Sequence, residues 1–288
     1  MLRTVEGPSS TATSFARVLA HRPPAPSPAT TVTPHGVRVP EWTPTATLLQ
    51  AYRDVVGSTA RMPLTFPAVI GVRLHRDLMG QGDLPVSGLG MVHVATELWS
   101  SGRLPVDAPW QVSAWADGTR HTRSGLEIDL WARCSSDDAT WTARIVVLAR
   151  STSARGDDDS AAPDLPRTTG DWDTETMLVA EEGTGRAYAR VSGDVNPIHL
   201  HSLTAKPFGF RRAIAHGWWA LPRALALLGA DSTPEQEGRY LDVAYRRPVL
   251  LPSRPTLLGA SSNEELRFLA VRDDDRPCFG GHLRSGEG

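Results

Sequence analysis

The sequence predicts an α+β protein made of two tandem units, in each of which an antiparallel sheet wraps around a central apolar helix. Three observations support this prediction. A stretch rich in Asp, Ser, Pro and Gly, from 151 to 170, divides the chain into halves of similar size. Each half contains an apolar segment of helical length, and several strand-like segments follow it. Because the order of elements repeats without clear sequence identity, we expect a pseudo-dimer within one chain.

The first half begins with a segment of low predicted order. Residues 1–30 are rich in Ser, Thr, Ala and Pro, so we expect a flexible arm with one or two helical turns. The first unit then spans 31–150, with a helix near 45–56 and an apolar segment over 66–79. Alternating apolar and polar residues, with β-branched and aromatic side chains, predict four antiparallel strands. These strand-like segments are 91–99, 110–118, 125–134 and 141–150.

The second unit spans 171–288, after a linker over 151–170. It opens with a short strand near 177–180 and a helix near 181–191. An apolar helix begins near His216, and the run 213–230 is too short and too often interrupted by polar residues to cross a membrane. We therefore interpret this run as a buried core helix. The last strand-like segments are 239–250, 254–262, 266–273 and 278–284.

Composition and charge exclude several classes of function. The chain is 40% hydrophobic and 22% charged, as in ordinary globular proteins, and its formal net charge of −2 gives no basic field for nucleic acid. Its two cysteines, Cys134 and Cys278, have no zinc-binding spacing, which favours a reducing compartment. The N-terminus has no apolar stretch typical of a secretory signal. We expect a cytoplasmic protein that binds neither nucleic acid nor membranes.

The segment that predicts chemistry is YARVSGDVNPIHLHSLTAKPFGFRRAIAHGWW, from 188 to 219. Gly193 can end the preceding helix because it adopts positive φ without a Cβ clash. Asp194 then emerges on a turn that Pro197 continues, and His199 follows five residues after Asp194. On a tight loop, this spacing can bring a carboxylate and an imidazole to a common point.

A carboxylate and a histidine directed at one water are suited to the hydration of a conjugated enoyl thioester. One group must take a proton from water, and another must deliver a proton to C2. Histidine titrates near neutral pH, and a nearby carboxylate favours its protonated form. The enolate-like charge on the thioester oxygen also needs a preorganised donor. Gly217, at the start of the apolar helix, offers a free N–H, the positive end of the helix dipole and no side chain.

The runs SGDVNPIH, FGF and IAHG resemble the hydratase 2 motif of the MaoC-like family of hot-dog-fold proteins. The two-part chain is similar to the actinobacterial (R)-3-hydroxyacyl-thioester dehydratases of double hot-dog architecture. This resemblance implies that Asp194 and His199 activate the catalytic water, that Asn196 shapes the loop and that Gly217 binds the thioester carbonyl. It implies reversible (R)-specific hydration of trans-2-enoyl thioesters, on coenzyme A or an acyl carrier protein, in fatty-acid or polyketide-type metabolism. It implies no metal or redox cofactor.

The chain departs from the family pattern at two positions and in its first half. Many relatives have Asp where this chain has His201, and the usual Met after the HG pair is Trp218, which puts the acyl-chain preference in doubt. The first half resembles a hot-dog unit at FPAVIGVRLHRDLM and GLGMVHVATEL but has no motif of this kind. We expect no chemistry there, and we interpret this half as a cover for the acyl chain.

Several residues of the motif allow a second interpretation. An Asp and a His on one loop also occur as a simple loop hydrogen bond, and His199 with His201 could bind a metal if they lay in a strand. His216 could be a structural or capping residue, or it could contact substrate. The basic cluster Lys206, Arg211 and Arg212 could be a solvated loop or could meet the phosphates of coenzyme A or an acidic carrier protein.

Two other functions compete with hydration. A hot-dog thioesterase would use a carboxylate near the start of the helix but would not need the Asp-Asn-Pro-His turn. A non-catalytic subunit would bind acyl groups or support a partner dehydratase, and the intact Asp194, His199 and Gly217 argue against it. In either case the chain would act as a monomeric pseudo-dimer or as a homodimer.

Overall fold

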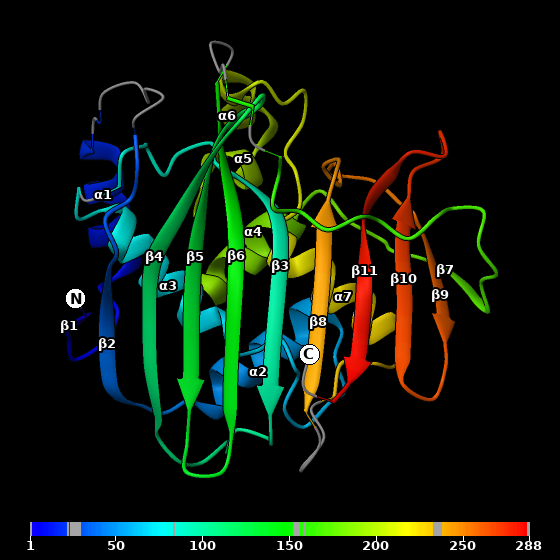
Figure 1. Cartoon of the computed structure of the whole chain (residues 1–288), viewed down its shortest axis with the longest axis horizontal. Helices are drawn as coiled ribbons and strands as arrows, with labels where there is room; N and C mark the ends of the chain where they lie inside the picture. Colours follow the sequence, from blue (N-terminus) through cyan, green and yellow to red (C-terminus); the bar gives the residue numbers. More distant parts are fainter. Residues whose placement is uncertain are drawn as a thin grey trace.

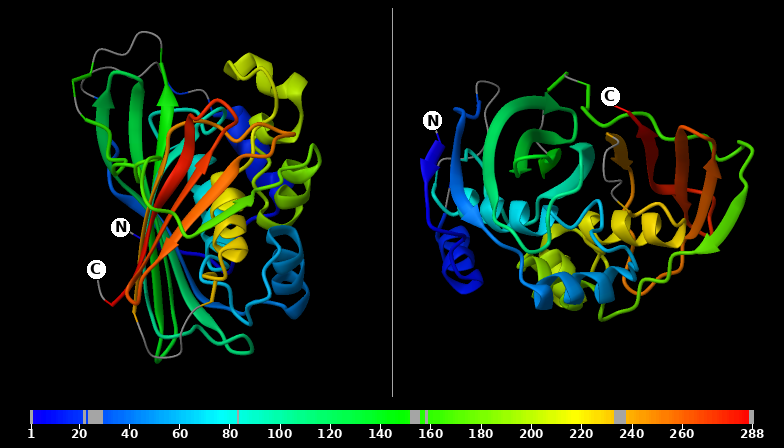
Figure 2. Two further views of the ribbon diagram at one scale, coloured as in Figure 1. Left: turned by 90° about the vertical axis from the view of Figure 1, so that its right-hand side faces the viewer. Right: turned by 90° about the horizontal axis from the view of Figure 1, so that it is seen from below.

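The strands of the protein form one continuous sheet with helices packed on one face (Figures 1 and 2). The structure is a computed structural model that describes residues 2–21, 23, 30–82, 84–151, 156–157, 159–232 and 238–286. The sheet has eleven strands within these residues, in the order β1-β2-β4-β5-β6-β3-β8-β11-β10-β9-β7. All pairs are antiparallel except the pairing of β1 with β2. The predicted α+β class is therefore confirmed.

The first half contains the helices and strands that the sequence pattern predicts. Helix α2 (Ala46–Val56) starts where the Thr45 side chain accepts a hydrogen bond from the Leu48 N–H, and it ends at Gly57 in the left-handed conformation. Helix α3 (Ala68–Met79) is almost wholly buried. The four predicted strands are β3 (Val92–Ser101), β4 (Trp110–Thr122), β5 (Gly125–Ser135) and β6 (Thr140–Arg150).

The second half repeats this order with shorter elements. Strand β7 (Thr174–Met177) and helix α4 (Thr184–Ser192) come first, and the short elements α5 (Pro197–Leu200), α6 (Ser202–Ala205) and η1 (Lys206–Phe208) follow. Helix α7 (Gly217–Leu227) is the predicted apolar helix. The remaining strands are β8 (Arg239–Tyr245), β9 (Thr256–Ser261), β10 (Glu265–Val271) and β11 (Pro277–Ser285).

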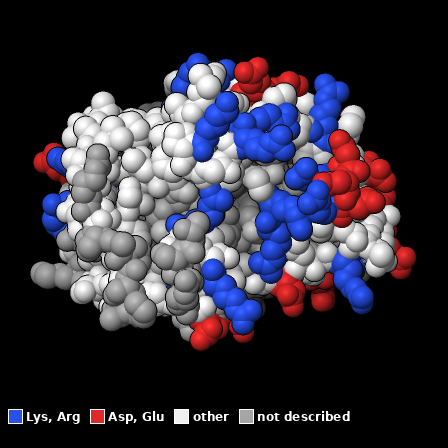
Figure 3. Space-filling view, turned by 90° about the horizontal axis from the view of Figure 1, so that it is seen from above, with Lys and Arg blue, Asp and Glu red and all other residues white. Residues whose placement is uncertain are grey.

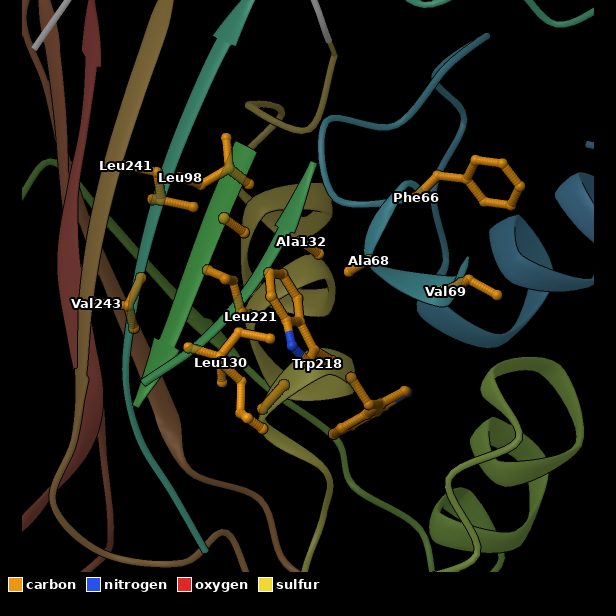
Figure 4. Close-up of a cluster of buried hydrophobic side chains, with 14 of the residues drawn as sticks. Phe66, Ala68, Val69, Leu98, Leu130, Ala132, Trp218, Leu221, Leu241 and Val243 are labelled. Atoms are coloured by element: carbon orange, nitrogen blue, oxygen red, sulfur yellow. The ribbon is translucent and has the colours of Figure 1, made fainter. Parts of the chain in front are cut away.

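Strands β3 and β8 join the two halves. Residues 95–100 of β3 pair with 239–244 of β8, so the edge of each half-sheet is covered by the other. Trp218 of α7 lies in a cluster with Leu130 of β5, and Leu98 and Leu241 of the joining strands lie in the same cluster (Figure 4). The halves therefore share one hydrophobic core.

Two N-terminal segments differ from the expectation. Strand β2 (His35–Trp42) has no counterpart among the predicted strands, and the structure has a register irregularity between Val39 and Trp42, where Pro40 lies. The segment expected as a flexible arm contains strand β1 (Leu2–Thr4) and helix α1 (Thr11–Ala20). Helix α1 packs on α3 and buries Val18, so these described residues of the arm are part of the fold.

None of the described helices is both long and apolar enough to cross a membrane. Helix α7, the centre of the apolar run 213–230, is instead a core helix. Its residues Trp219, Leu221 and Leu225 are at most 3% exposed. The interpretation of this run as a buried helix is therefore confirmed.

Separating the halves should expose this shared core. We expect residues 171–288, expressed alone, to aggregate or to form a new self-dimer, because the β8 edge and the side of α7 that faces the first half lose their cover. Coexpressed halves should reassociate and recover activity far above that of either half. Size-exclusion chromatography with light scattering tests this expectation. A monomeric, stable fragment 171–288 with full activity would contradict it.

Candidate active site

A cavity of about 340 Å³ lies between the two halves, beside the predicted catalytic turn. The second half contributes Asp194, His199 and Gly217 to its wall. The first half contributes apolar side chains from α3, β5 and β6, and α1 adds Phe15 and Val18. The cavity therefore has a polar end at the motif and an apolar interior built mainly by the first half, which suits a ligand with a reactive head and a hydrocarbon chain.

Local hydrogen bonds fix the place of Asp194. Helix α4 ends at Gly193, whose φ is 76°, and the Gly193 N–H donates to the Ala189 carbonyl. The Ser192 hydroxyl accepts from the Asp194 N–H (3.1 Å), and the Asp194 Oδ1 accepts from the Asn196 N–H (3.1 Å). The Asp194 side chain is 34% exposed, so its second oxygen can meet a water or a ligand in the cavity.

His199 lies on α5 and is 9% exposed. Its Nδ1 lies 2.8 Å from the Ile214 carbonyl oxygen, and since a carbonyl only accepts, Nδ1 carries the proton. The neutral ring then has its lone pair on Nε2. The ligand atoms of Asp194, His199 and His216 all lie within 4.8 Å of one another. The turn therefore brings the predicted carboxylate and imidazole together. The alternative that places His199 and His201 on a strand is wrong, because His199 lies on α5 and His201 is the cap of α6.

His216 belongs to the same cluster and supports both groups. Its ring stacks on that of His199, with centroids 3.7 Å apart. Its Nε2 donates to the Asp194 main-chain carbonyl (3.1 Å) and lies 3.8 Å from the carboxylate Oδ2. The Nδ1 of His216 is buried and has no hydrogen-bond partner in the described chain. His216 forms no side-chain cap on α7, and its ring contacts Tyr188, with centroids 5.0 Å apart, as well as the predicted pair.

Burial and mutual proximity set the charges of the cluster. Burial raises the pKa of Asp194, but the neighbouring groups, led by His216 and His199, hold that pKa below its usual value. Burial lowers the pKa of His199, and the Asp194 carboxylate offsets this only in part. Burial likewise lowers the pKa of His216 to about 3. At neutral pH the cluster therefore consists of an ionised carboxylate and two neutral imidazoles. The expected protonation of His199 by its carboxylate neighbour is outweighed by burial.

The same three residues are close enough to share a metal ion. One nitrogen of each histidine is already used, however, since His199 Nδ1 donates to the Ile214 carbonyl and His216 Nε2 to the Asp194 carbonyl. The remaining His216 nitrogen is buried. His201, the other histidine of the HxH pattern, accepts from the Leu203 N–H as the cap of α6. The absence of a metal from the reaction stays a prediction that a chelator can test.

Gly217 is the first residue of α7. The Ala213 carbonyl, four residues back, accepts from the Leu251 N–H (2.8 Å), so the Gly217 N–H has no partner of the helical kind. The imidazole of His93, from β3 of the first half, lies against Gly217, and a Cβ at Gly217 would overlap its Nδ1. The His93 Nε2 donates to the Ala95 carbonyl (2.9 Å), and burial lowers the His93 pKa to about 3. The neutral His93 ring therefore fills the space beside Gly217, and only glycine fits at this position without displacing it.

Gly217→Ala should lower kcat/KM by about 10²-fold, because a shift of about 1 Å at a reacting group can cost that much. The added methyl group would displace His93 or the start of α7, on which the carbonyl of the ligand would bind. Gly183→Ala is a matched control, because a Cβ at Gly183 meets no atom within 4 Å. Steady-state kinetics with an enoyl thioester tests the pair. Equal kcat/KM values for the two variants would mean that Gly217 has no part in the site.

Asn196 connects the motif to the first half. Its side-chain oxygen accepts from the Gly90 N–H (3.3 Å), and its Nδ2 donates to the Met91 carbonyl (3.4 Å). These contacts fit the predicted role of shaping the loop. The first half also contributes His93 and Arg76 to the cavity wall, and the sequence reading assigned neither of them a role. His93 is an isolated polar residue in an apolar segment, whereas Arg76 lies between His75 and Asp77, so the sequence gives little indication of a role for either.

The basic residues at the cavity differ from the predicted cluster. Besides Arg76, the arginines that line it are Arg150, Arg246 and Arg247. Lys206 and Arg211 are exposed near it, and Arg212 donates to the Pro252 carbonyl (3.0 Å) beside a second, smaller cavity. Seen from above, the surface is hollowed near its centre, and Lys and Arg side chains gather around the hollow (Figure 3). A polyanionic carrier could bind there, and a role for Lys206, Arg211 and Arg212 stays a proposal.

Trp218 lines the cavity and is 5% exposed. Its ring lies 5.9 Å from His93 and 6.3 Å from Trp141, measured between centroids. Its side chain points from α7 towards Leu130 of the first-half sheet (Figure 4). The bulky ring thus forms part of the cavity wall, next to His93 and Trp141 of the first half.

The chain is similar to known proteins in part of its sequence and in its fold. Residues 160–264 match the MaoC like domain. The chain is 29% identical over 225 residues to 3-hydroxyacyl-thioester dehydratase X of Mycobacterium tuberculosis, which covers 74% of this chain and 75% of that protein. The crystal structure of HtdX from Mycobacterium tuberculosis has a TM-score of 0.73 and 25% identity, over 86% of this chain and 99% of that one.

A more distant structure shares the fold. A MaoC-like dehydratase from Phytophthora capsici has a TM-score of 0.65 at 13% identity, over 89% of this chain and 96% of its own. Both structural matches extend over nearly the whole of this chain, well beyond the matched domain. The predicted tandem hot-dog architecture is therefore confirmed.

Proposed function

We propose that this chain, whose second half contains a MaoC-like domain, catalyses the hydration of trans-2-enoyl thioesters and the reverse dehydration of (R)-3-hydroxyacyl thioesters. The similarity to 3-hydroxyacyl-thioester dehydratase X supports the reaction class. The single observation that carries the proposal is the cluster of Asp194, His199 and His216, beside Gly217, in the wall of a cavity to which the first half contributes many apolar side chains. The reaction belongs to fatty-acid or polyketide-type metabolism, which is consistent with a cytoplasmic location.

Asp194 and His199 share the acid–base work in this proposal. A water between the carboxylate and the His199 Nε2 loses a proton as its oxygen bonds to C3, and the C2–C3 double bond becomes an enolate. The His199 Nδ1 proton is bonded to the Ile214 carbonyl, and Asp194 is ionised, so neither group begins with a proton to give. The proton that C2 receives is therefore the one taken from the water. Addition of H and OH from one water held on one face is syn, and it leaves the enzyme unchanged.

Gly217 binds the thioester carbonyl in this proposal. The oxygen gains negative charge as the enolate forms, and a free N–H at the start of a helix offers both a hydrogen bond and a favourable dipole. The acyl chain then extends into the apolar part of the cavity, towards α3, β5 and β6. The carrier, coenzyme A or an acyl carrier protein, lies outside at the basic residues. No cofactor takes part in any step.

One assay separates this proposal from its rivals. Purified protein mixed with crotonyl-CoA and longer enoyl-CoA substrates should remove the absorbance of the conjugated enoyl thioester and yield the (R)-3-hydroxyacyl product. A thioesterase would instead release a free thiol, which a thiol reagent detects. A non-catalytic acyl-binding protein would bind the thioester without either change. The (S) product, or thiol release without loss of the enoyl group, would refute the proposal.

A further inference from the structure

Two arginines of the first half contact the C-terminal end of α4. Asp194 follows directly after this end of the helix. Arg73 and Arg76 are three residues apart on α3 and so lie on one face of that helix. Arg73 Nη2 donates to the Val191 carbonyl (2.8 Å), and Arg76 Nη1 donates to the Gly193 carbonyl (2.5 Å). Carbonyls at a helix end lack partners within the helix and carry its negative dipole. Two guanidinium groups therefore cap the end of α4 across the interface.

The two arginines differ in burial. Arg73 is half-buried and does not line the cavity, whereas Arg76 is 7% exposed and does. Two further Arg76 N–H groups donate to the Ser9 carbonyl and the Thr11 hydroxyl, each at 3.3 Å, whereas the buried Nε has no partner among the described residues. Its neighbour Asp77 accepts from the Ser9 N–H (2.7 Å) and the Ser14 hydroxyl. The N-terminal segment thus closes over a buried cation that already reaches the catalytic turn.

Gly193 is shaped for this contact. Its φ of 76° favours glycine, and a Cβ there would lie 2.5 Å from Arg76 Nη1. The carbonyl that accepts from Arg76 belongs to the peptide bond that leads directly into Asp194. Any movement of the guanidinium therefore moves the start of the catalytic turn.

We propose that Arg76 of the first half is the positioning residue of the catalytic turn, which it holds through the Gly193 carbonyl so that the Asp194 carboxylate faces the cavity. The N-terminal segment acts on the same residue, because Ser9 and Thr11 fix the other side of the guanidinium. The half without the motif is then required for the chemistry itself as well as for the acyl wall. This inference rests on the proposed function, because it assumes that Asp194 performs acid–base work.

Arg76 also affects the charge of Asp194. The guanidinium helps to hold the pKa of the Asp194 carboxyl below its usual value, although burial opposes this and the imidazoles act more strongly. The charged and titratable groups that face Asp194 come from five elements or loops: His216, His199, Arg76, Tyr188 and His93. Loss of Arg76 removes the only permanent cation in this set. The Asp194 pKa should rise, and activity that needs the ionised carboxylate should then be lost at a higher pH on the acidic side.

Arg76→Met keeps the length of the side chain and removes its charge and donors. We expect kcat to fall by about 10–10²-fold, the range of a small misplacement, with KM changed by less than about threefold. The acidic limb of the kcat/KM profile for crotonyl-CoA should move to higher pH. Arg76→Lys should return that limb towards its wild-type position, because the charge is kept. The matched control is Arg73→Met, which removes a cap of the same helix but no hydrogen bond to Gly193, since Arg73 donates to the Val191 carbonyl.

Hydrogen exchange gives a readout that does not depend on activity. Peptides spanning 188–200 should exchange faster in Arg76→Met than in Arg73→Met, because only the first variant frees the Gly193 turn. Equal exchange, equal kcat and an unmoved acidic limb in the two variants would overturn the inference. If Arg76→Met does not fold, Arg76→Lys still tests it, since a lysine cannot reproduce the forked donors and should raise exchange. A wild-type protein that hydrates no enoyl thioester would instead refute the proposed function, and the exchange result would still stand.

Discussion

Asp194→Asn is expected to lower kcat for enoyl-thioester hydration by about 10²–10⁴-fold, the usual range for the loss of an acid–base group. The substitution keeps the size of the side chain and lets the amide oxygen accept from the Asn196 N–H as Oδ1 does now (3.1 Å), so the turn should persist. The amide lacks the negative charge that would attract a water proton. KM should change little, because the acyl wall and Gly217 are unaffected.

Stopped-flow or steady-state absorbance measurements with crotonyl-CoA would test this expectation. Glu175→Gln is a suitable control, because it also removes a carboxylate but lies on the exposed strand β7, away from the cavity. Both proteins should show wild-type circular dichroism and melting temperatures. A folded Asp194→Asn variant that retained near-normal turnover would remove Asp194 from the catalytic pair.

The conformation of the turn from 194 to 199 could be predicted because its geometry is local. Gly193 ends the helix, Pro197 restricts the following backbone, and six residues from 194 to 199 bring the carboxylate and the imidazole together. The long strands could be predicted for a similar reason, because their alternating or β-branched patterns are present within each segment.

The rest of the site depends on contacts between distant parts of the chain. His93 and Arg76 lie more than 100 residues from the catalytic turn, and they reach it because β3 pairs with β8 and α3 packs against α4. No local pattern distinguishes them from ordinary polar residues of an amphipathic strand or helix. The stacking of His216 on His199 also requires the loop between them to fold back. The charge state of His199 was predicted poorly for the same reason. Burial lowers the pKa of His199, and burial depends on tertiary contacts.

The N-terminal segment shows how composition can outweigh a weaker local signal. Its Ser, Thr and Pro content suggests a loose arm, whereas residues 11–20 form a helix capped by the Ser10 side chain, which accepts from the Thr13 N–H. Helix α1 becomes stable where Val18 is buried and Ser14 donates to the buried Asp77 carboxylate. Tertiary contacts therefore provide the stability that this short helix would lack in isolation.

His199→Ala should lower kcat by a similar amount, about 10²–10⁴-fold, because the imidazole Nε2 is the neutral base that faces the cavity. Some additional loss is expected from the His216 ring, which stacks on His199 at 3.7 Å and would lose that contact. His199→Gln is the better-matched variant, since its amide can still donate to the Ile214 carbonyl while lacking a basic nitrogen. If kcat falls equally in the two variants, the loss is due to proton transfer and not to the packing of His216.

The double variant Asp194→Asn/His199→Gln decides whether the two groups act on one water. Groups that act as a unit are not additive, so the double variant should lose much less than the product of the two single losses. The close approach of their ligand atoms, within 4.8 Å together with those of His216, is the structural reason for this expectation. Measurement of kcat for all four proteins at one pH completes the cycle. Strict multiplication of the two effects would mean that each group serves a separate step, and the shared water would have to be abandoned.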